Sequence, residues 1–421
     1  MIRALTLFMA VECGMTAQTD AGLDLWIRVR EHIRASAAGL PNYTCQESMD
    51  RSIYAPTGRI EFRERLRLEV LFAETTELFA WPGSSEFTSE PLQTWIGAGA
   101  IGNGDLVTET LKLFVISAAT VKYAGIETRD QRALYRFDFH IPILNSGYTL
   151  TIHGKSATTA YSGSFWVEQE SLDIARLDTR AEGIPSDLDC RDAHQSVTYG
   201  RVRLGADQRL VPSAAELTIV GGDGHESRNT VAFNNCRQYA ASSSLSFTTP
   251  PDIAAAAGPR PQRALPSHIA LVLRLEQPIS VVESAAGDQI VAQLDKAVNA
   301  GSVRLPKGTR VLGRIRRLEQ HLSSPPSILV GLQFFGAEAP DGLLTFSSRL
   351  VGPRTIPGTA PAVDGALENV PGAAGLDNEN APSTSGLDIE DDGTRTGVGS
   401  FRMSGKKLRI GRGFRTIWET Q

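Results

Sequence analysis

Long hydrophobic runs are missing from this sequence. No apolar stretch reaches the roughly 18–20 residues that a helix needs to span a membrane. Aromatic residues are scarce, at 7%, and the formal net charge of -5 over 421 residues provides no excess of basic side chains for a nucleic-acid partner. Phosphate-binding glycine motifs, zinc-protease histidine pairs and CxxC pairs are absent as well. We therefore expect no nucleic-acid partner, no cofactor, no conventional enzyme activity and no membrane span in the mature chain.

The N-terminus has the features of a secretory signal peptide. A positive charge near the start is followed by an apolar core over residues 5–11, and Ala17 is a small residue suited to cleavage. An ordinary buried helix is the alternative, which Glu12 and Gly14 disfavour because they interrupt the apolar pattern. We predict a signal peptide over residues 1–17, cleaved before Gln18, and a periplasmic or extracellular mature protein.

Cysteine is rare, with 4 residues in the chain. Cys45, Cys190 and Cys236 remain after the predicted cleavage, in an oxidising compartment where disulfides form and persist. Their odd number leaves one thiol free or paired between chains. Spacing does not decide the connectivity. We favour Cys45–Cys236, whose long loop would gain roughly 4–5 kcal/mol on the chain-entropy model, with Cys190–Cys236 as the alternative.

Turn-forming residues are abundant, with 39 Gly and 22 Pro, as expected for many short strands. Apolar residues alternate with charged ones over residues 59–72, and aromatic residues alternate over residues 135–141, which is the period of a half-buried strand. The sequence therefore predicts a mostly β fold with a few helices.

Two segments have helical periodicity instead. In residues 20–36, Trp26, Val29 and Ile33 fall on one face, and Gly39 with Pro41 ends the pattern. Residues 105–117 form the second predicted helix, with Phe114 on its apolar face. The first helix face either covers an apolar cavity or simply packs on the sheet.

Changes in amino-acid composition along the chain indicate a linker and a disordered segment between the folded parts. A Pro/Ala-rich stretch reads as a semi-rigid linker, and an acidic stretch with few large apolar residues reads as disordered. The predicted parts are a half-barrel over residues 18–249, a linker over 250–266, a second β-barrel over 267–352 plus 400–421, and a disordered acidic insertion over 353–399.

No catalytic or metal-binding constellation emerges from the sequence. Ser162 lacks the flanking glycines of a nucleophile elbow. His140 and His153 alternate with apolar residues on neighbouring predicted strands but have no third metal ligand. The acidic run over residues 388–393 matches a calcium loop only in part, because Gly399 stands where a bidentate glutamate belongs.

Three stretches of the N-terminal part match a known pattern: residues 163–168 (GSFWVE), residues 172–177 (LDIARL) and the later Val211-Pro212 pair. Through them, residues 20–247 resemble the LolA-like superfamily of lipoprotein carriers. The resemblance implies an open half-barrel whose concave apolar face is covered by helices and holds acyl chains. The cysteines and the long second part depart from that family.

Four stretches of the second part also match a known pattern: residues 287–292 (GDQIVA), 305–309 (LPKGT), 311–313 (VLG) and 340–342 (PDG). Through them, this part resembles the C-terminal barrel of TrbI-type conjugation proteins. The resemblance implies a small β-barrel. The N-terminal membrane helix of that family is missing here, so a channel role is not implied.

Two hypotheses for function follow. The first is a non-catalytic envelope protein whose half-barrel binds an apolar ligand, either a lipid or an acyl chain. The alternative is an envelope scaffold or protein-interaction module that acts through the second β-barrel. The residues expected to bind the ligand are Trp26, Val29, Ile33, Phe62, Leu66, Leu68 and Phe114.

Overall fold

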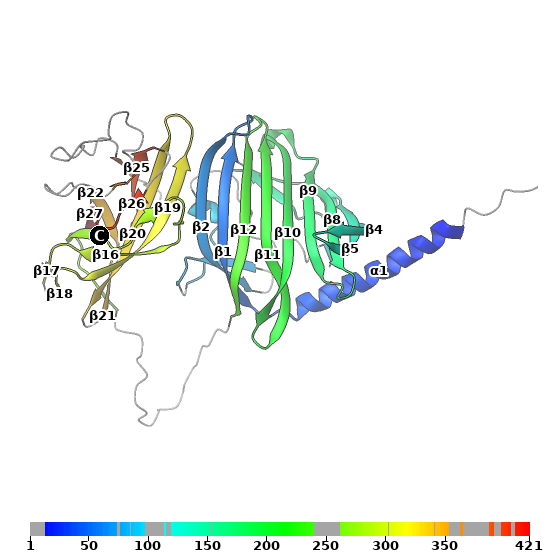
Figure 1. Cartoon of the computed structure of the whole chain (residues 1–421), viewed down its shortest axis with the longest axis horizontal. Coiled ribbons are helices and arrows are strands. Elements are labelled where there is room, and N and C mark those ends of the chain that lie inside the picture. The colour runs from blue at the N-terminus through cyan, green and yellow to red at the C-terminus, as the bar shows by residue number, and fades with distance from the viewer. Residues whose placement is uncertain are drawn as a thin grey trace, which may run out of the picture. The chain divides into compact units, whose positions relative to one another are not determined.

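The computed structural model describes residues 13–73, 76–84, 86–96, 113–114, 119–152, 154–239, 262–301, 303–340, 342–352, 363–364, 387–390, 397–405 and 409–421. The described elements are a long helix, α1, short 3-10 helices η1–η3, and strands β1–β27 (Figure 1). Contacts divide the chain into two compact units. Unit 1 consists of Met1–Cys45, Leu71–Glu77 and Ala100–Tyr239, and unit 2 of Gln46–Val70, Leu78–Gly99 and Ala240–Gln421.

These units do not follow the predicted boundaries. The sequence assigned everything from residue 18 to residue 249 to one half-barrel, whereas contacts group residues 46–70 and 78–99 with the C-terminal part. The reason is that strand partners in a sheet are chosen by tertiary contacts, which local periodicity does not report.

Helix α1 spans Cys13–Ala38 and is longer than the predicted helix over residues 20–36. Its apolar face lies where the spacing predicted, because Val29 and Ile33 are buried and Trp26 is half-buried. Residues 13–17 of the predicted signal peptide are helical, and residues 1–12 lie outside the described residues. The signal peptide therefore stays a prediction.

Unit 1 contains an antiparallel sheet whose strands follow one another in sequence order, apart from a small separate sheet formed by β6 and β7. The short helices η2 (Ile143–Asn145) and η3 (Ser186–Leu188) connect strands of this unit. Its strands are β4 (Thr120–Arg129), β5 (Arg132–Ile141), β6 (Thr149–Ile152), β7 (Lys155–Thr158), β8 (Ala160–Glu168), β9 (Ile174–Glu182), β10 (Cys190–Leu204), β11 (Asp207–Gly221) and β12 (Glu226–Gln238).

The alternation in β5 shows how the sequence fixes the two faces of this sheet. Phe137, Phe139 and Ile141 are buried on one face, while Asp138 and His140 lie between them on the other. Successive side chains of a strand point to opposite faces. The predicted mostly β fold is thus confirmed, with antiparallel pairing throughout the described sheet of unit 1.

Three further strands lie between α1 and η1 (Leu92–Trp95): β1 (Tyr43–Tyr54), β2 (Ile60–Ala73) and β3 (Thr76–Ala80). Each of them contributes residues to both units. In unit 1, Cys45 of β1 forms a disulfide with Cys236 of β12, which confirms the favoured pairing. Cys190 is a free, half-buried thiol.

Unit 2 contains a second antiparallel sheet, which joins β22, β27, β14, β16, β19, β20, β25 and β24 in that order. Strand β21 pairs antiparallel with the remaining part of β20 and parallel with β13. The strands of the sheet are β13 (Gln262–Ala264), β14 (Ala270–Leu275), β16 (Gln289–Leu294), β19 (Arg310–His321), β20 (Ser327–Ala339), β21 (Gly342–Thr345), β22 (Ser348–Gly352), β24 (Leu387–Glu390), β25 (Gly399–Ser404) and β27 (Arg415–Thr420).

Short pairings complete this unit. Strand β26 (Arg409–Ile410) pairs with β15 (Ile279–Ser280) and β23 (Val363–Asp364), and β17 (Val298–Ala300) pairs with β18 (Val303–Leu305). The C-terminal strand β27 lies between β14 and β22, so the end of the chain returns to the sheet as expected.

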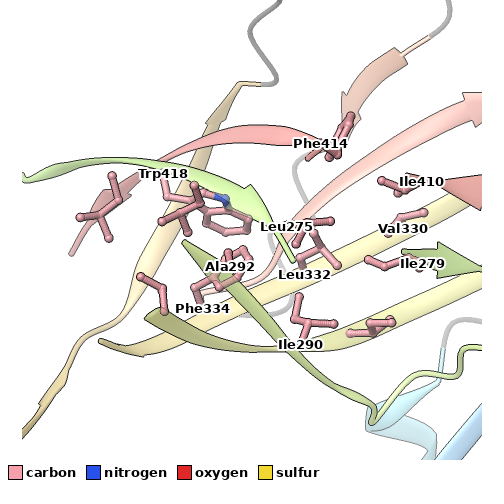
Figure 2. Packing of buried hydrophobic residues seen from close by; sticks show 14 of the residues in the cluster. Leu275, Ile279, Ile290, Ala292, Val330, Leu332, Phe334, Ile410, Phe414 and Trp418 are labelled. Atoms are coloured by element: carbon pink, nitrogen blue, oxygen red, sulfur yellow. The ribbon is translucent and has the colours of Figure 1, made fainter. Parts of the chain in front are cut away.

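A packed apolar core fills unit 2 (Figure 2). Phe334 and Trp418 meet edge to face, with ring centroids 5.1 Å apart. Gly399 allows this packing, because a Cβ there would lie 2.6 Å from the Trp418 ring. Leu275, Ile290 and the other labelled residues belong to the same cluster (Figure 2).

Residues 342–352 pair with β20 through β21 and with β27 through β22, so the described ladders lead from β20 back to β27 by way of this segment. A closed second barrel stays a prediction. The 353–399 insertion is not wholly irregular, because β23 and β24 within it are paired strands. Its remaining residues before residue 397 lie outside the described residues, as does most of the predicted helix over residues 105–117.

Candidate apolar site under helix α1

The inner face of α1 lies on an aromatic cluster of unit 1. The Trp26 ring centroid is 5.8 Å from Phe114, 6.0 Å from Phe137 and 5.8 Å from Phe165. Val29 and Ile33, one and two turns further along the helix, are buried in the same place. We call this set the α1 cluster; its buried members are Val29, Ile33, Leu113, Phe114, Phe137, Phe139, Ile141, Tyr148, Leu150, Tyr161, Phe165, Val167, Ile174, Leu177, Ala181, Leu188, Ala193 and Ile219.

Sheet register builds the floor of the cluster. Phe137 of β5 and Phe165 of β8 are direct cross-strand partners, and their rings stack with centroids 5.0 Å apart. Cross-strand aromatic pairs of this kind contribute roughly 0.2–1 kcal/mol beyond an alanine pair. The Trp26 indole packs against both rings, so side chains of the protein itself cover this part of the cluster.

Polar contacts attach α1 to the rest of unit 1. His32 Nε2 donates to Asp173 Oδ1 at 2.9 Å, and Arg201 Nε donates to Asp173 Oδ2 at 2.7 Å. Asp173 is only 5% exposed, so both hydrogen bonds are made by a buried carboxylate. Arg30 Nε donates to the carbonyl oxygen of Phe114 at 2.8 Å. The helix is therefore held by an apolar face and by these polar contacts along one side.

The structure divides the residues that were expected to bind ligand. Trp26, Val29, Ile33 and Phe114 come together in the α1 cluster. Phe62, Leu66 and Leu68 are buried too, but they lie on β2 within residues 46–70 and belong to unit 2. The seven residues as one ligand site therefore stay a prediction.

Residues 46–70, the part of the β1–β2 hairpin that belongs to unit 2, bury charged side chains beside apolar ones. Arg51 donates a hydrogen bond to Glu64, and both side chains are almost completely buried. Burial lowers the pKa of Arg51, and the carboxylates of Glu64 and Glu319 oppose that shift. Glu319 also accepts hydrogen bonds from Arg317 at 2.7 Å and from His321 at 3.1 Å.

Glu47 on the same hairpin is buried without a counter-charge. Its side chain has 4% exposure, and no hydrogen bond or ion pair involves it among the described residues. Burial raises the pKa of Glu47 to about 7. The alternation of charged residues in this part of the sequence gave no sign that one carboxyl faces inward.

Tyr43 is another buried polar residue that sequence reasoning missed. It has 1% exposure and stacks on Phe72 with ring centroids 4.6 Å apart, while Phe72 meets Phe233 at 5.8 Å. The Tyr43 hydroxyl is buried and makes no hydrogen bond among the described residues. Burial, then the carboxylate of Glu77 and the nearby Tyr199, raise the pKa of Tyr43.

The residues weighed for catalysis form a surface cluster instead. Ser162 Oγ donates to Glu182, and His140 Nδ1 lies 3.3 Å from the other oxygen of that carboxylate. A serine nucleophile needs the histidine on its own hydroxyl, whereas here the carboxylate lies between the two. Within the described side chains, no three His, Cys, Asp or Glu residues gather to hold a metal ion. His153 lies outside the described residues.

No protein-family model and no curated protein matches this chain. Similar solved structures include a domain from Vibrio parahaemolyticus that is described as an outer membrane lipoprotein-sorting protein. Its sequence is 10% identical to this chain, the TM-score is 0.31, and the alignment covers 53% of this chain and 95% of that domain. A DUF1329 family protein from Desulfovibrio piger is 14% identical with a TM-score of 0.29 over 53% and 95%. Lipoprotein LppX from Mycobacterium tuberculosis is 12% identical with a TM-score of 0.19 over 50% and 96%.

The three structures each align with about half of this chain, and one of them is named as a lipoprotein-sorting protein domain. At TM-scores of this size, the likeness does not by itself assign a function to this chain. The TrbI-type resemblance of the second part stays a prediction.

Proposed function

We propose that this protein is a non-catalytic binding protein of the bacterial envelope that holds an apolar ligand, a lipid or an acyl chain, against the α1 cluster. The observation that carries the proposal is the position of Trp26. Its half-buried indole lies on three phenylalanine rings and separates a large apolar cluster from solvent. Ligand sites for apolar molecules are lined mainly by aromatic and aliphatic side chains, as this cluster is.

Ligand entry requires the face of α1 to move, because Trp26, Val29 and Ile33 lie on the cluster in this structure. Full burial of a residue such as Val29 or Ile33 stabilises by about 1.5–3 kcal/mol. An acyl chain that takes the place of the helix face would gain a similar free energy of burial. Replacement of the helix face by the acyl chain is therefore close to neutral in free energy. The His32–Asp173 hydrogen bond and the Arg30–Phe114 hydrogen bond then decide how easily the helix is released.

Two observations support an exported location. The Cys45–Cys236 disulfide is typical of oxidising compartments, and the N-terminal residues have the pattern of a signal peptide. None of the helices in the described part of the chain is both long and apolar enough to cross a membrane.

The alternative function is an envelope scaffold or protein-interaction module that acts through the second sheet. It is favoured by the two extensive clusters of buried apolar side chains, one in each unit. A scaffold would keep both cores filled permanently.

Lipid analysis separates the two functions. The mature protein is purified from an envelope fraction, and the lipids that copurify are quantified by mass spectrometry. We expect lipid above background, and we expect Trp26→Ala to change its amount several-fold. Leu23→Ala is the matched control, because Leu23 lies on the same helix with 56% exposure. Background lipid in every sample would support the scaffold.

A further inference from the structure

Arg314 of β19 is a buried cation with 7% exposure. Its Nη1 atom donates to the carbonyl oxygens of Pro82 at 2.9 Å and Gly287 at 3.0 Å, and no carboxylate pairs with it in the part of the chain that the structure describes. Burial lowers the pKa of Arg314 to about 10. The Asp288 carboxylate opposes that shift, but both of its oxygens accept hydrogen bonds from Arg67, at 2.6 and 2.7 Å. A buried charge is costly unless an opposite charge compensates it, so the described residues leave this guanidinium incompletely compensated.

One edge of the Arg314 guanidinium suits an oxyanion. The two carbonyl oxygens occupy Nη1, whereas Nε and Nη2 have no partner among the described residues. Neither atom is among the solvent-inaccessible polar atoms of those residues that lack a partner, so solvent reaches this edge. The N–H bonds of Nε and Nη2 lie side by side, which is the geometry that binds two oxygens of one carboxylate or phosphate.

Strand register places a further donor beside this edge. Arg314 lies opposite Gln289 of β16 and opposite Gln333 of β20, so the three side chains form one row on the same face of the sheet. Gln333 Oε1 accepts a 2.6 Å hydrogen bond from Arg316, which leaves the Gln333 Nε2 group as a donor without a partner among the described residues. Gln289 is exposed and Gln333 is half-buried, so the row is accessible from solvent.

Trp81 holds the charged side chains of this row in place. Its ring centroid lies 4.7 Å from the Arg316 guanidinium and 5.9 Å from that of Arg314. Trp81 in turn stacks on the buried Trp95, with ring centroids 4.5 Å apart. Contacts of a guanidinium with an aromatic face are attractive, so two positive charges and the Gln333 amide are fixed close together.

We propose that Arg314, Arg316 and Gln333 form a binding site for a phosphate group. Arg314 binds two phosphate oxygens through Nε and Nη2, Gln333 Nε2 donates to a third, and Arg316 adds positive charge. A carboxylate has only two oxygens and one negative charge, so it satisfies fewer of these groups. The phosphate belongs either to a small soluble ester or to a phospholipid head group, which present the same oxygens. The site lies in unit 2 and is independent of the function proposed above.

The test is a calorimetric titration of the full mature protein with inorganic phosphate at about pH 7.5, where phosphate is mostly a dianion. Wild type should bind one phosphate per chain. Arg314→Gln should weaken this binding by at least about tenfold, because it removes two charge-assisted hydrogen bonds. Arg310→Gln is the matched control and should bind as wild type does. Arg310 lies on the same strand, but it is exposed and pairs with Glu338 at 3.0 Å.

Gln333→Glu tests the site even if Arg314→Gln folds poorly. The new carboxylate has the size of the amide and still accepts the hydrogen bond from Arg316, so thermal unfolding should show a folded protein. It places a negative charge where the amide donates, and phosphate binding should be lost.

Two further ligands distinguish the sources of the phosphate. Binding of glycerol 3-phosphate that is lost in Arg314→Gln assigns the site to a soluble phosphate ester. Binding only of phosphatidylglycerol vesicles, with the same loss, assigns it to a lipid head group. Acetate that binds as tightly as phosphate would overturn the choice of phosphate. The site itself is wrong if wild type binds no phosphate, or if folded Arg314→Gln and Gln333→Glu proteins bind it as wild type does.

Discussion

His32 of α1 donates a 2.9 Å hydrogen bond to Asp173, a buried carboxylate at the turn that leads into β9. The same carboxylate accepts a hydrogen bond from Arg201 of β10. One side chain thus connects the helix to two strands that lie more than a hundred residues away in sequence.

Asp173→Asn should loosen α1. The change removes a charged acceptor from two donors, and loss of such buried hydrogen bonds costs roughly 1–3 kcal/mol. We expect the free energy of unfolding in urea to fall by about that amount, and amide exchange in α1 to become faster. Asp178→Asn is the control, since Asp178 pairs with Arg176 at a partly exposed position. Surface pairs of that kind contribute less than about 1 kcal/mol. Unchanged exchange in α1 would show that the Asp173 contact does not hold the helix.

Glu47 should make the protein less stable as the pH rises from about 5 to about 8. Its folded-state pKa of about 7 lies above the unfolded value of 4.5, so the folded state binds more protons in that window. The free energy of unfolding therefore falls with rising pH, by up to about 3 kcal/mol. Glu47→Gln should lack this decline and be the more stable protein near pH 8.

The measurement for Glu47 is urea unfolding at several pH values. Glu90→Gln serves as the control, because Glu90 is exposed and its loss should leave the pH profile of wild type intact. A Glu47→Gln profile that still falls in parallel with wild type would assign the pH dependence to other groups.

The Cys45–Cys236 disulfide determines how many cysteine thiols should react in the denatured, non-reduced protein. Mature protein that begins at Gln18 should have one reactive thiol, that of Cys190, when it is denatured without reductant. Two thiols would mean that Cys13 is retained and the chain is not cleaved before Gln18. Three or more would mean that the disulfide is absent in solution. Cys45→Ser together with Cys236→Ser should lower the free energy of unfolding by about 2–5 kcal/mol.

Limited proteolysis tests the return of the C-terminus to the second sheet. Cleavage within residues 365–386 should leave the C-terminal fragment attached, because β25 pairs with β20 and β27 pairs with β14 and β22. Buried Phe401 and Trp418 add apolar contacts to these ladders. The fragment should separate on a sizing column only in denaturant. Its separation under native conditions would contradict this sheet order.

Local pattern was enough to predict much of the fold. The period of two in β5 and the helical spacing of Trp26, Val29 and Ile33 each identified a buried face, because each reflects a choice between core and solvent made within one element. The pairing of Cys45 with Cys236 was favoured but not decided, since spacing left Cys190 as an alternative partner.

Only the tertiary structure decided which distant elements share a core. The hairpin residues Phe62, Leu66 and Leu68 read as part of the N-terminal half-barrel, yet contacts place them in unit 2, where β2 pairs with β19 and Arg67 binds Asp288. The residue pattern within one strand does not indicate which strand or side chain more than two hundred residues away will pair with it. The sequence also could not predict that the Tyr43 hydroxyl and Glu47 are buried without partners among the described residues. Whether a buried polar group has a partner depends on the positions of all the residues around it, and only the tertiary structure sets these positions.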